Sequence, residues 1–179
     1  MLAAGGKTNA LGRANEVIDL FKNDPSRLGE LYDCLAHEDA WIRMRAIDSL
    51  EKICREHPEW IEPYIERFQN ELSASDQPSI QWHLAQIYGQ VILKPDQKLR
   101  ATQWLKHLLS TREVDWIVAA NAMDTLVKFA GDGSVPFADV VPLLKVQQGH
   151  KSSAVVKRAG KLLARLTGTD NTEFDMMGS

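Results

Sequence analysis

Apolar side chains recur with helical spacing in four segments, which begin at Ile42, Ile80, Val118 and Val155. Within each segment they follow at intervals of four, four and three residues, which is typical of one face of an α-helix. The segment starts lie 38, 38 and 37 residues apart, so the pattern is a repeat. We predict that this stripe is the buried face of four helices. It comprises Ile42, Ala46, Leu50 and Ile53; Ile80, Leu84, Tyr88 and Val91; Val118, Ala122, Leu126 and Phe129; and Val155, Ala159, Leu163 and Leu166.

Polar residues recur in the same four segments, one residue before, two after and six after the central apolar residue. These three offsets share one side of a helix, at a right angle or more from the apolar stripe. We call this side the polar flank. It comprises Arg45, Asp48 and Lys52; His83, Gln86 and Gln90; Asn121, Asp124 and Lys128; and Arg158, Lys161 and Arg165.

A further helix is expected before each of these four, and Pro, Gly and short polar runs separate the elements. One more helix near the start, with Ala14, Val17, Ile18 and Phe21, would cover the open end of the core. Strict alternation of apolar and polar residues is missing, so the predicted class is all-α. The expected apolar positions of the preceding helices are Leu28, Leu31 and Leu35; Ile61, Ile65, Phe68 and Leu72; Ala101, Leu105 and Leu108; and Val140, Val141 and Leu144.

The pattern predicts a single domain over residues 13–167, made of about four antiparallel helix pairs after the first helix. The predicted pairs span roughly residues 27–56, 58–93, 95–130 and 136–167. Residues 1–12 are expected to form a flexible N-terminus, and residues 168–179 a disordered tail.

The repeat resembles the HEAT family, in which an aliphatic residue, an arginine, a central alanine and a leucine follow an acidic turn. The resemblance extends from Arg27 to Thr167 and is carried best by the first copy, with Glu38, Asp39, Ile42, Arg43, Ala46 and Leu50. It implies a HEAT-like solenoid, that is, a right-handed α-α superhelix whose second helices line the concave surface. The polar flank would then face the inside of the curve and bind a protein or peptide partner.

Charge and composition narrow the function classes. The net charge of -3 and the pI near 6.0 argue against a dedicated nucleic-acid binder. Neither a membrane span nor a secretory signal over Met1–Gly12 is predicted. With only Cys34 and Cys54, the expected compartment is a reducing cytoplasm.

The last repeat is basic, because six cations and no acid lie between Val140 and Thr167. These cations steer an acidic protein segment or a phosphate backbone, or they keep a terminal helix soluble. Both interpretations remain open at this point. The cations are Lys145, Lys151, Lys157, Arg158, Lys161 and Arg165.

Motifs for catalysis or cofactors are weak. The GGKT run at Gly5–Thr8 lacks the first glycine of a phosphate-binding loop and a preceding strand, so a flexible terminus is favoured. The five histidines lie in different elements, and Cys34 with His37 forms a single pair without a matching second pair. Cys54 lies beside the apolar stripe without an evident activating base. We therefore predict no catalytic residue, metal or cofactor.

Five tryptophans raise one enzymatic alternative in a HEAT-like context, the alkylpurine DNA glycosylases, which use aromatic residues and an aspartate on a concave face. The corresponding candidates are Asp115, Trp116, Asp124, Arg45 and Arg158. A HEAT-like DNA-binding protein is a related alternative. A third alternative is an accessory lyase such as the HEAT-like bilin lyases, but their repeats are shorter than the 37 and 38 residues of this chain. The favoured prediction is a non-enzymatic protein-interaction module of undetermined oligomeric state.

Overall fold

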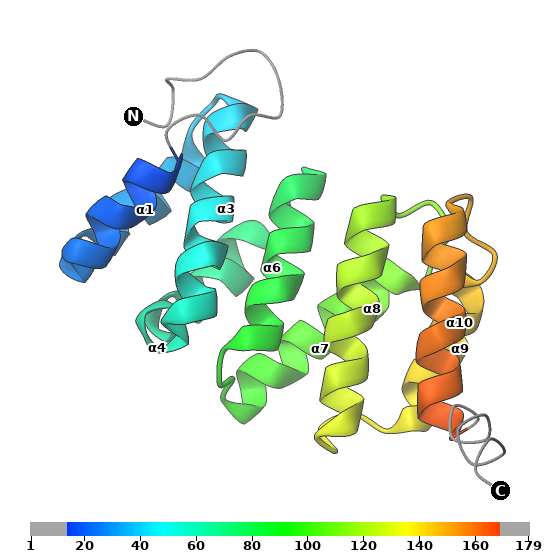
Figure 1. Cartoon of the computed structure of the whole chain (residues 1–179). Coiled ribbons are helices and arrows are strands. Elements are labelled where there is room, and N and C mark those ends of the chain that lie inside the picture. The colour runs from blue at the N-terminus through cyan, green and yellow to red at the C-terminus, as the bar shows by residue number, and fades with distance from the viewer. Residues whose placement is uncertain (1–13, 169–179) are drawn as a thin grey trace, which may run out of the picture. The chain divides into compact units, whose positions relative to one another are not determined.

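The computed structural model describes residues 14–168, and all of its regular elements within that range are helical (Figure 1). This confirms the predicted all-α class. The expectations for the flexible N-terminus, the GGKT run and the tail from residue 169 onward lie outside the described residues. None of the described helices is both long and apolar enough to cross a bilayer.

The chain divides into two compact units, and the division falls between Gln97 and Lys98 within α7 (Pro95–Leu109). The expected grouping of residues 13–167 into one repeat domain stays a prediction.

Unit 1 is organised around α3, which packs against α1 on one side and α6 on the other. Asp39 begins α3 as its N-cap, because its carboxylate accepts a hydrogen bond of 2.8 Å from the Trp41 backbone N–H. The elements are α1 (Ala14–Asn23), η1 (Pro25–Arg27), α2 (Leu28–Asp33), η2 (Cys34–Ala36), α3 (Ala40–Glu56), α4 (Pro58–Ile61), η3 (Glu62–Tyr64), α5 (Ile65–Arg67), η4 (Phe68–Leu72) and α6 (Pro78–Gln90).

The helix that precedes α6 is irregular, although one continuous helix was expected there. It consists of α4, the 3-10 turn η3, α5 and the π-helical turn η4. Pro63 lies in the first turn of η3 and has no backbone N–H to donate, which explains the break in the α-helical ladder. The predicted apolar residues Ile61, Ile65, Phe68 and Leu72 are nevertheless buried.

Unit 2 contains the rest of α7, α8 (Trp116–Gly131), α9 (Phe137–Gln147) and α10 (Ser153–Thr167). Helix α10 packs against both α8 and α9. In α7 Ala101, Leu105 and Leu109 are buried, whereas the predicted Leu108 is half-buried, as is the predicted Val141 of α9.

The predicted central residues are completely buried in all four second helices: Ala46, Leu84, Ala122 and Ala159 are each 0% exposed. Most of the apolar stripe is buried with them. Only its end in α10 is half-buried, at Leu163 and Leu166. The spacing of the repeat therefore predicted the buried face of each second helix correctly.

Candidate functional site

The polar flank in unit 1 is mostly inaccessible. Arg45 is 3%, Asp48 8% and His83 1% exposed, whereas Lys52, Gln86 and Gln90 are half-buried. The flank of α3 and that of α6 meet between the two packed helices. These residues therefore contact other parts of the chain more than solvent.

Asp48 is the centre of this buried contact. Its Oδ1 lies 3.4 Å from His83 Nε2 on α6, and its Oδ2 lies 2.9 Å from Lys52 Nζ on α3. Burial raises the pKa of Asp48, but the hydrogen bonds from His83 and Lys52 outweigh it, so the net pKa is below the usual value. His83 Nδ1 lies 2.6 Å from the Ser79 carbonyl oxygen, to which it donates when it carries a proton.

A second buried carboxylate, Glu51, also joins α3 to α6. Gln90 Nε2 donates to Glu51 Oε1 over 2.7 Å, and Arg55 Nη2 lies 2.9 and 2.7 Å from the two Glu51 oxygens. The Glu51 side chain is 2% exposed. Sequence reasoning missed Glu51 because it does not occupy one of the three repeated polar offsets.

In unit 2 the same offsets bring Asp124 of α8 and Arg158 of α10 together. Arg158 Nε donates to Asp124 Oδ1 over 2.8 Å, and Arg158 Nη2 donates to Oδ2, so the pair is bidentate. This hydrogen bonding raises the pKa of Arg158. Asp48–His83 and Asp124–Arg158 thus join equivalent positions, two residues after one central residue and one before the next.

The remaining flank of unit 2 is open to solvent. Lys128, Lys161 and Arg165 are exposed, and Arg158 keeps 51% of its side chain exposed despite its pairing. Asn121 is half-buried and donates to the Ile117 carbonyl within its own helix over 2.8 Å. The cations that the sequence placed on the last repeat therefore form an accessible surface.

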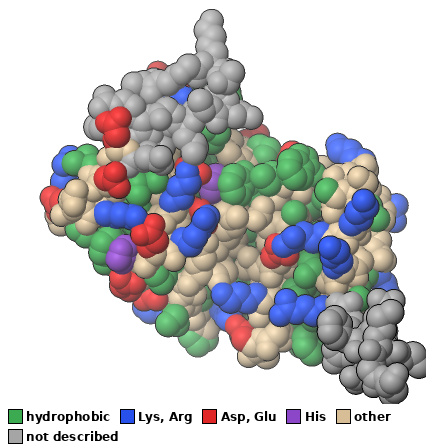
Figure 2. Space-filling view, in the orientation of Figure 1, with side chains coloured by type: hydrophobic (Ala, Val, Ile, Leu, Met, Phe, Trp, Pro, Cys, Tyr) green, Lys and Arg blue, Asp and Glu red, His purple; other side chains and the backbone are tan. Residues whose placement is uncertain are grey.

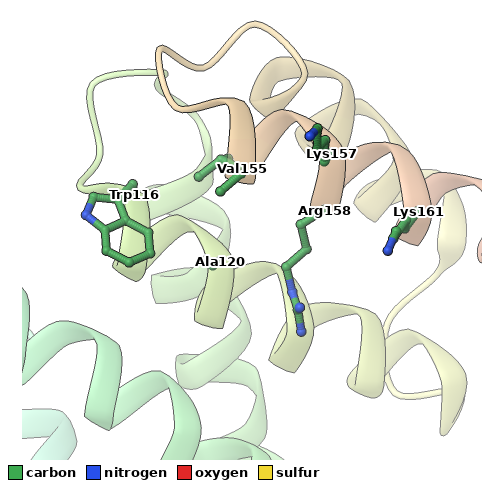
Figure 3. A pocket seen from close by; sticks show the side chains of 7 residues that line it. Trp116, Ala120, Val155, Lys157, Arg158 and Lys161 are labelled. Carbon is green, nitrogen blue, oxygen red and sulfur yellow. The ribbon is translucent and has the colours of Figure 1, made fainter.

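A groove lies between α8 and α10 on this surface, with a volume of about 330 Å³ (Figure 3). Figure 3 shows the Trp116 indole at one end, Val155 and Ala120 in the middle, and Lys161 at the other end. The indole of Trp116 is largely uncovered, because the residue is 53% exposed. The lining residues are Trp116, Ala120, Ala154, Val155, Lys157, Arg158 and Lys161.

Buried and partly buried hydrogen bonds fix the Trp116 end of this groove. Gln147 Nε2 donates to the carbonyls of Leu109 and Thr111, over 2.9 and 2.8 Å, on the segment that leads into α8. His150 Nε2 lies 2.8 Å from the Val114 carbonyl, and its Nδ1 accepts from the Ser152 N–H over 2.9 Å. The start of α8, which carries Trp116, is thereby fixed against the start of α10.

The groove is positively charged. None of its seven described lining residues is acidic, and Lys157, Arg158 and Lys161 surround an apolar floor. Residues 98–168 contain eleven Lys and Arg against five Asp and Glu, whereas residues 14–97 contain eight against sixteen. Figure 2 shows Lys and Arg side chains gathered over α8 and α10.

A second cavity, of about 330 Å³, lies in unit 1 beside Tyr32, and sequence reasoning missed it. Its polar groups satisfy one another: the Tyr32 hydroxyl donates to Glu71 Oε2 over 2.9 Å, and the Arg67 guanidinium lies 3.9 Å from the Tyr32 ring centre. Arg67 Nε also donates to Glu71 Oε1 over 3.0 Å. Because these groups are already partnered, the cavity offers a ligand few open contacts.

The residues considered for catalysis have structural partners. The Asp115 carboxylate caps α8 by accepting from the Ile117 N–H over 2.9 Å, and Asp124 binds Arg158. Burial raises the pKa of Cys54 to about 12, which keeps its thiol protonated. Burial also raises the pKa of Cys34. Within residues 14–168, no three His, Cys, Asp or Glu side chains form a metal-binding group.

Comparison of the chain with models of protein families, with curated proteins and with solved structures finds no match. The candidate function therefore rests on the geometry of the chain itself.

Proposed function

We propose that the chain is a non-enzymatic protein-binding module whose α8–α10 groove binds an acidic peptide segment that carries a large apolar side chain. The observation that carries this proposal is the exposed Trp116 beside an apolar floor and three cations. The module acts in a reducing cytoplasm, in keeping with the composition.

The groove suits such a peptide for two separate reasons. Partly buried tryptophans are frequent anchors of protein interfaces, because the indole supplies a large rigid contact area. Lys157 and Lys161 on the rim attract carboxylates, speed association and set the orientation of the peptide. The volume of about 330 Å³ is enough for one or two side chains of a bound segment.

A peptide fits this site better than a nucleic-acid backbone. A backbone binder neutralises many phosphates along an extended track, whereas this groove has an apolar floor to which Ala120 and the exposed Ala154 contribute, above the fully buried Val155. Two donors of Arg158 are already used by Asp124. Binding of duplex DNA, which the glycosylase alternative requires, would contradict the proposal of a peptide site.

For the architecture we propose a HEAT-like right-handed solenoid. Two facts support it: the central residues of the four second helices are equally buried, and the Asp48–His83 and Asp124–Arg158 pairs occupy equivalent offsets. Extended surfaces of stacked helix pairs serve recognition more often than catalysis.

Fluorescence anisotropy with a labelled peptide tests the binding site. The probe contains one Phe between two Asp-Glu pairs, and a second probe has Ser in place of Phe. Replacing Lys157→Glu together with Lys161→Glu should weaken binding of the first probe by at least about tenfold, because two attractive charges become repulsive. The Ser probe should bind the unmodified chain more weakly than the Phe probe, because it leaves the apolar floor uncovered.

A matched control carries Lys145→Glu and Lys151→Glu, which make the same charge change at exposed positions that do not line the groove. This control should bind the Phe probe within about twofold of the unmodified chain. Equal losses in the two double variants would show a non-specific charge effect and overturn the proposal. Tighter, strongly salt-dependent binding of duplex DNA than of the probe would favour the nucleic-acid alternative instead.

A further inference from the structure

The segment that follows α10 has the chemistry of the ligand just proposed. Residues 169–179 contain three acids, no Lys or Arg, and three large apolar residues. Two of the acids flank an aromatic residue, in the order Glu173, Phe174, Asp175. We propose that this segment, which lies outside the described residues, occupies the α8–α10 groove of its own chain and competes with a foreign acidic peptide.

A row of cations on α10 leads from its end toward the groove. Arg165, Lys161, Arg158 and Lys157 are all exposed, and the helix contains no acid. Arg165, Lys161 and Arg158 lie four and three residues apart, so they follow one side of the helix. An acidic segment that turns back along α10 therefore passes Arg165 and Lys161 before it reaches Arg158, whose charge is shared with Asp124.

The end of α10 favours such a change of direction. Gly168 has a positive φ of 72° and a left-handed conformation, and its N–H bonds to the Ala164 carbonyl. A left-handed residue ends the helix and directs the chain away from the helix axis. Gly168 thus ends α10 and does not continue its axis.

The length of the segment matches the distance to the groove. Gly168 and Val155 are thirteen residues apart, or about 20 Å at the helical rise of about 1.5 Å per residue. From Gly168, the six steps to Phe174 span at most about 20 Å in an extended chain. Phe174 can therefore reach the level of Arg158, ten residues or about 15 Å from Gly168, with length left for the change of direction, and Glu173 and Asp175 can then lie beside Lys157 or Lys161.

Attachment to the same chain makes weak docking effective. A short tether gives the segment an effective concentration of about 1 mM. If the segment alone binds with a dissociation constant of about 100 μM, a foreign peptide binds the full chain roughly tenfold more weakly than the open groove. The inference rests on the proposed function, because it needs the groove to bind acidic peptides.

The main test uses the full chain with Asp170→Asn, Glu173→Gln, Asp175→Asn and Phe174→Ala, and the labelled Phe probe described above. This variant should bind the probe about tenfold more tightly than the unmodified chain, since its own segment no longer competes. A chain ending at Gly168 should show the same gain. A peptide of residues 169–179, added separately, should displace the probe from that shortened chain but not from its Lys157→Glu, Lys161→Glu variant.

A matched control neutralises Asp19, Glu66 and Asp76 by Asp19→Asn, Glu66→Gln and Asp76→Asn, three exposed acids of unit 1. It should bind the probe as the unmodified chain does. If it gains affinity as strongly as the segment variant, the effect is one of net charge and the inference is wrong.

The remaining outcomes separate the two proposals. Equal probe affinity of the full and shortened chains overturns the inference and leaves the proposed function intact. Absence of binding of both the probe and the separate peptide to the shortened chain overturns both. Sedimentation that shows a dimer of the full chain and a monomer of the shortened chain assigns the segment to the groove of a second copy, which also overturns self-occupancy.

Discussion

The polar flank has opposite environments in the two units. In unit 1, Arg45, Asp48 and His83 are at most 8% exposed, whereas in unit 2 Arg158, Lys161 and Arg165 are exposed. Helix α3 is covered on one side by α1 and on the other by α6, while α10 packs on the described helices α8 and α9. The same sequence offsets therefore join two helices in both units, but the pair is buried in unit 1 and partly exposed, beside solvent-exposed cations, in unit 2.

This difference separates stability from binding. A buried ion pair loses its hydration, and removal of one partner leaves a buried charge or polar group without compensation. An exposed pair is solvated in any case and contributes little to stability. Substitutions in the polar flank of unit 1 should therefore lower the free energy of unfolding. Substitutions in the flank of unit 2 should mainly change the affinity for a ligand.

The largest expected effect is on unfolding. Asp48→Ala should lower the free energy of unfolding by about 2 to 3 kcal/mol, because the buried His83 loses its partner. Asp124→Ala, at the equivalent offset, should lower it by less than about 1 kcal/mol, because the Asp124–Arg158 pair is partly exposed. Urea unfolding followed by circular dichroism measures both. Similar losses for the two variants would contradict the contrast between the units.

Thiol labelling sharpens this prediction, because both cysteines lie in unit 1. In a Cys34→Ser background, only the buried Cys54 remains, and it reacts only when unit 1 opens. Asp48→Ala should raise the labelling rate of Cys54 about 30-fold, the factor that corresponds to about 2 kcal/mol in the opening equilibrium. Asp124→Ala should leave that rate unchanged. An increase with Asp124→Ala would mean that both units open together.

An intermediate effect is expected on peptide binding. Trp116→Ala should weaken binding of the Phe probe about tenfold, because one wall of the groove is lost. Trp41 in unit 1 is similarly exposed, at 44% against 53% for Trp116, and provides the control. Trp41→Ala should leave probe binding unchanged. A loss that is equal for both tryptophans would place the binding surface outside the α8–α10 groove.

The smallest expected effect is a pH dependence in unit 1. Because the folded-state pKa of Asp48 is lowered, its carboxylate contributes stability that is complete above the unfolded pKa of about 3.9 and is lost as pH falls through the lower folded pKa. The difference in unfolding free energy between the unmodified chain and Asp48→Asn should be constant from about pH 7 to pH 5 and shrink below about pH 4. Urea unfolding across this range measures it. A difference that grows toward acid would show the opposite sign of the pKa shift.

Several features of the fold were predictable from residue spacing. The burial of Ala46, Leu84, Ala122 and Ala159 was predicted from the period of the repeat, and so were the second helices that carry them. The break at Pro63 was missed, although proline is the local signal that marks it. The choice between Leu108 and Leu109 in α7 was also missed, because spacings of three and four both fit a helix.

The candidate site was predicted only in part. Lys157, Arg158 and Lys161 were recognised as a basic cluster, but their position around Trp116 was not. That position depends on Gln147 and His150, which fix the segment before α8 against the start of α10 from 36 or more residues away. Such hydrogen bonds leave no periodic trace in the sequence.

By itself, the sequence determined the all-α class, the buried face of each repeated helix and the offsets at which polar residues recur. These follow from local geometry, since the helical period assigns each residue to a face. Only the tertiary structure decided that the flank of α3 is buried against α6, while the flank of α10 borders an open groove beside Trp116. The physical reason is that the exposure of a flank depends on which helices pack over it, and those helices are distant in the sequence.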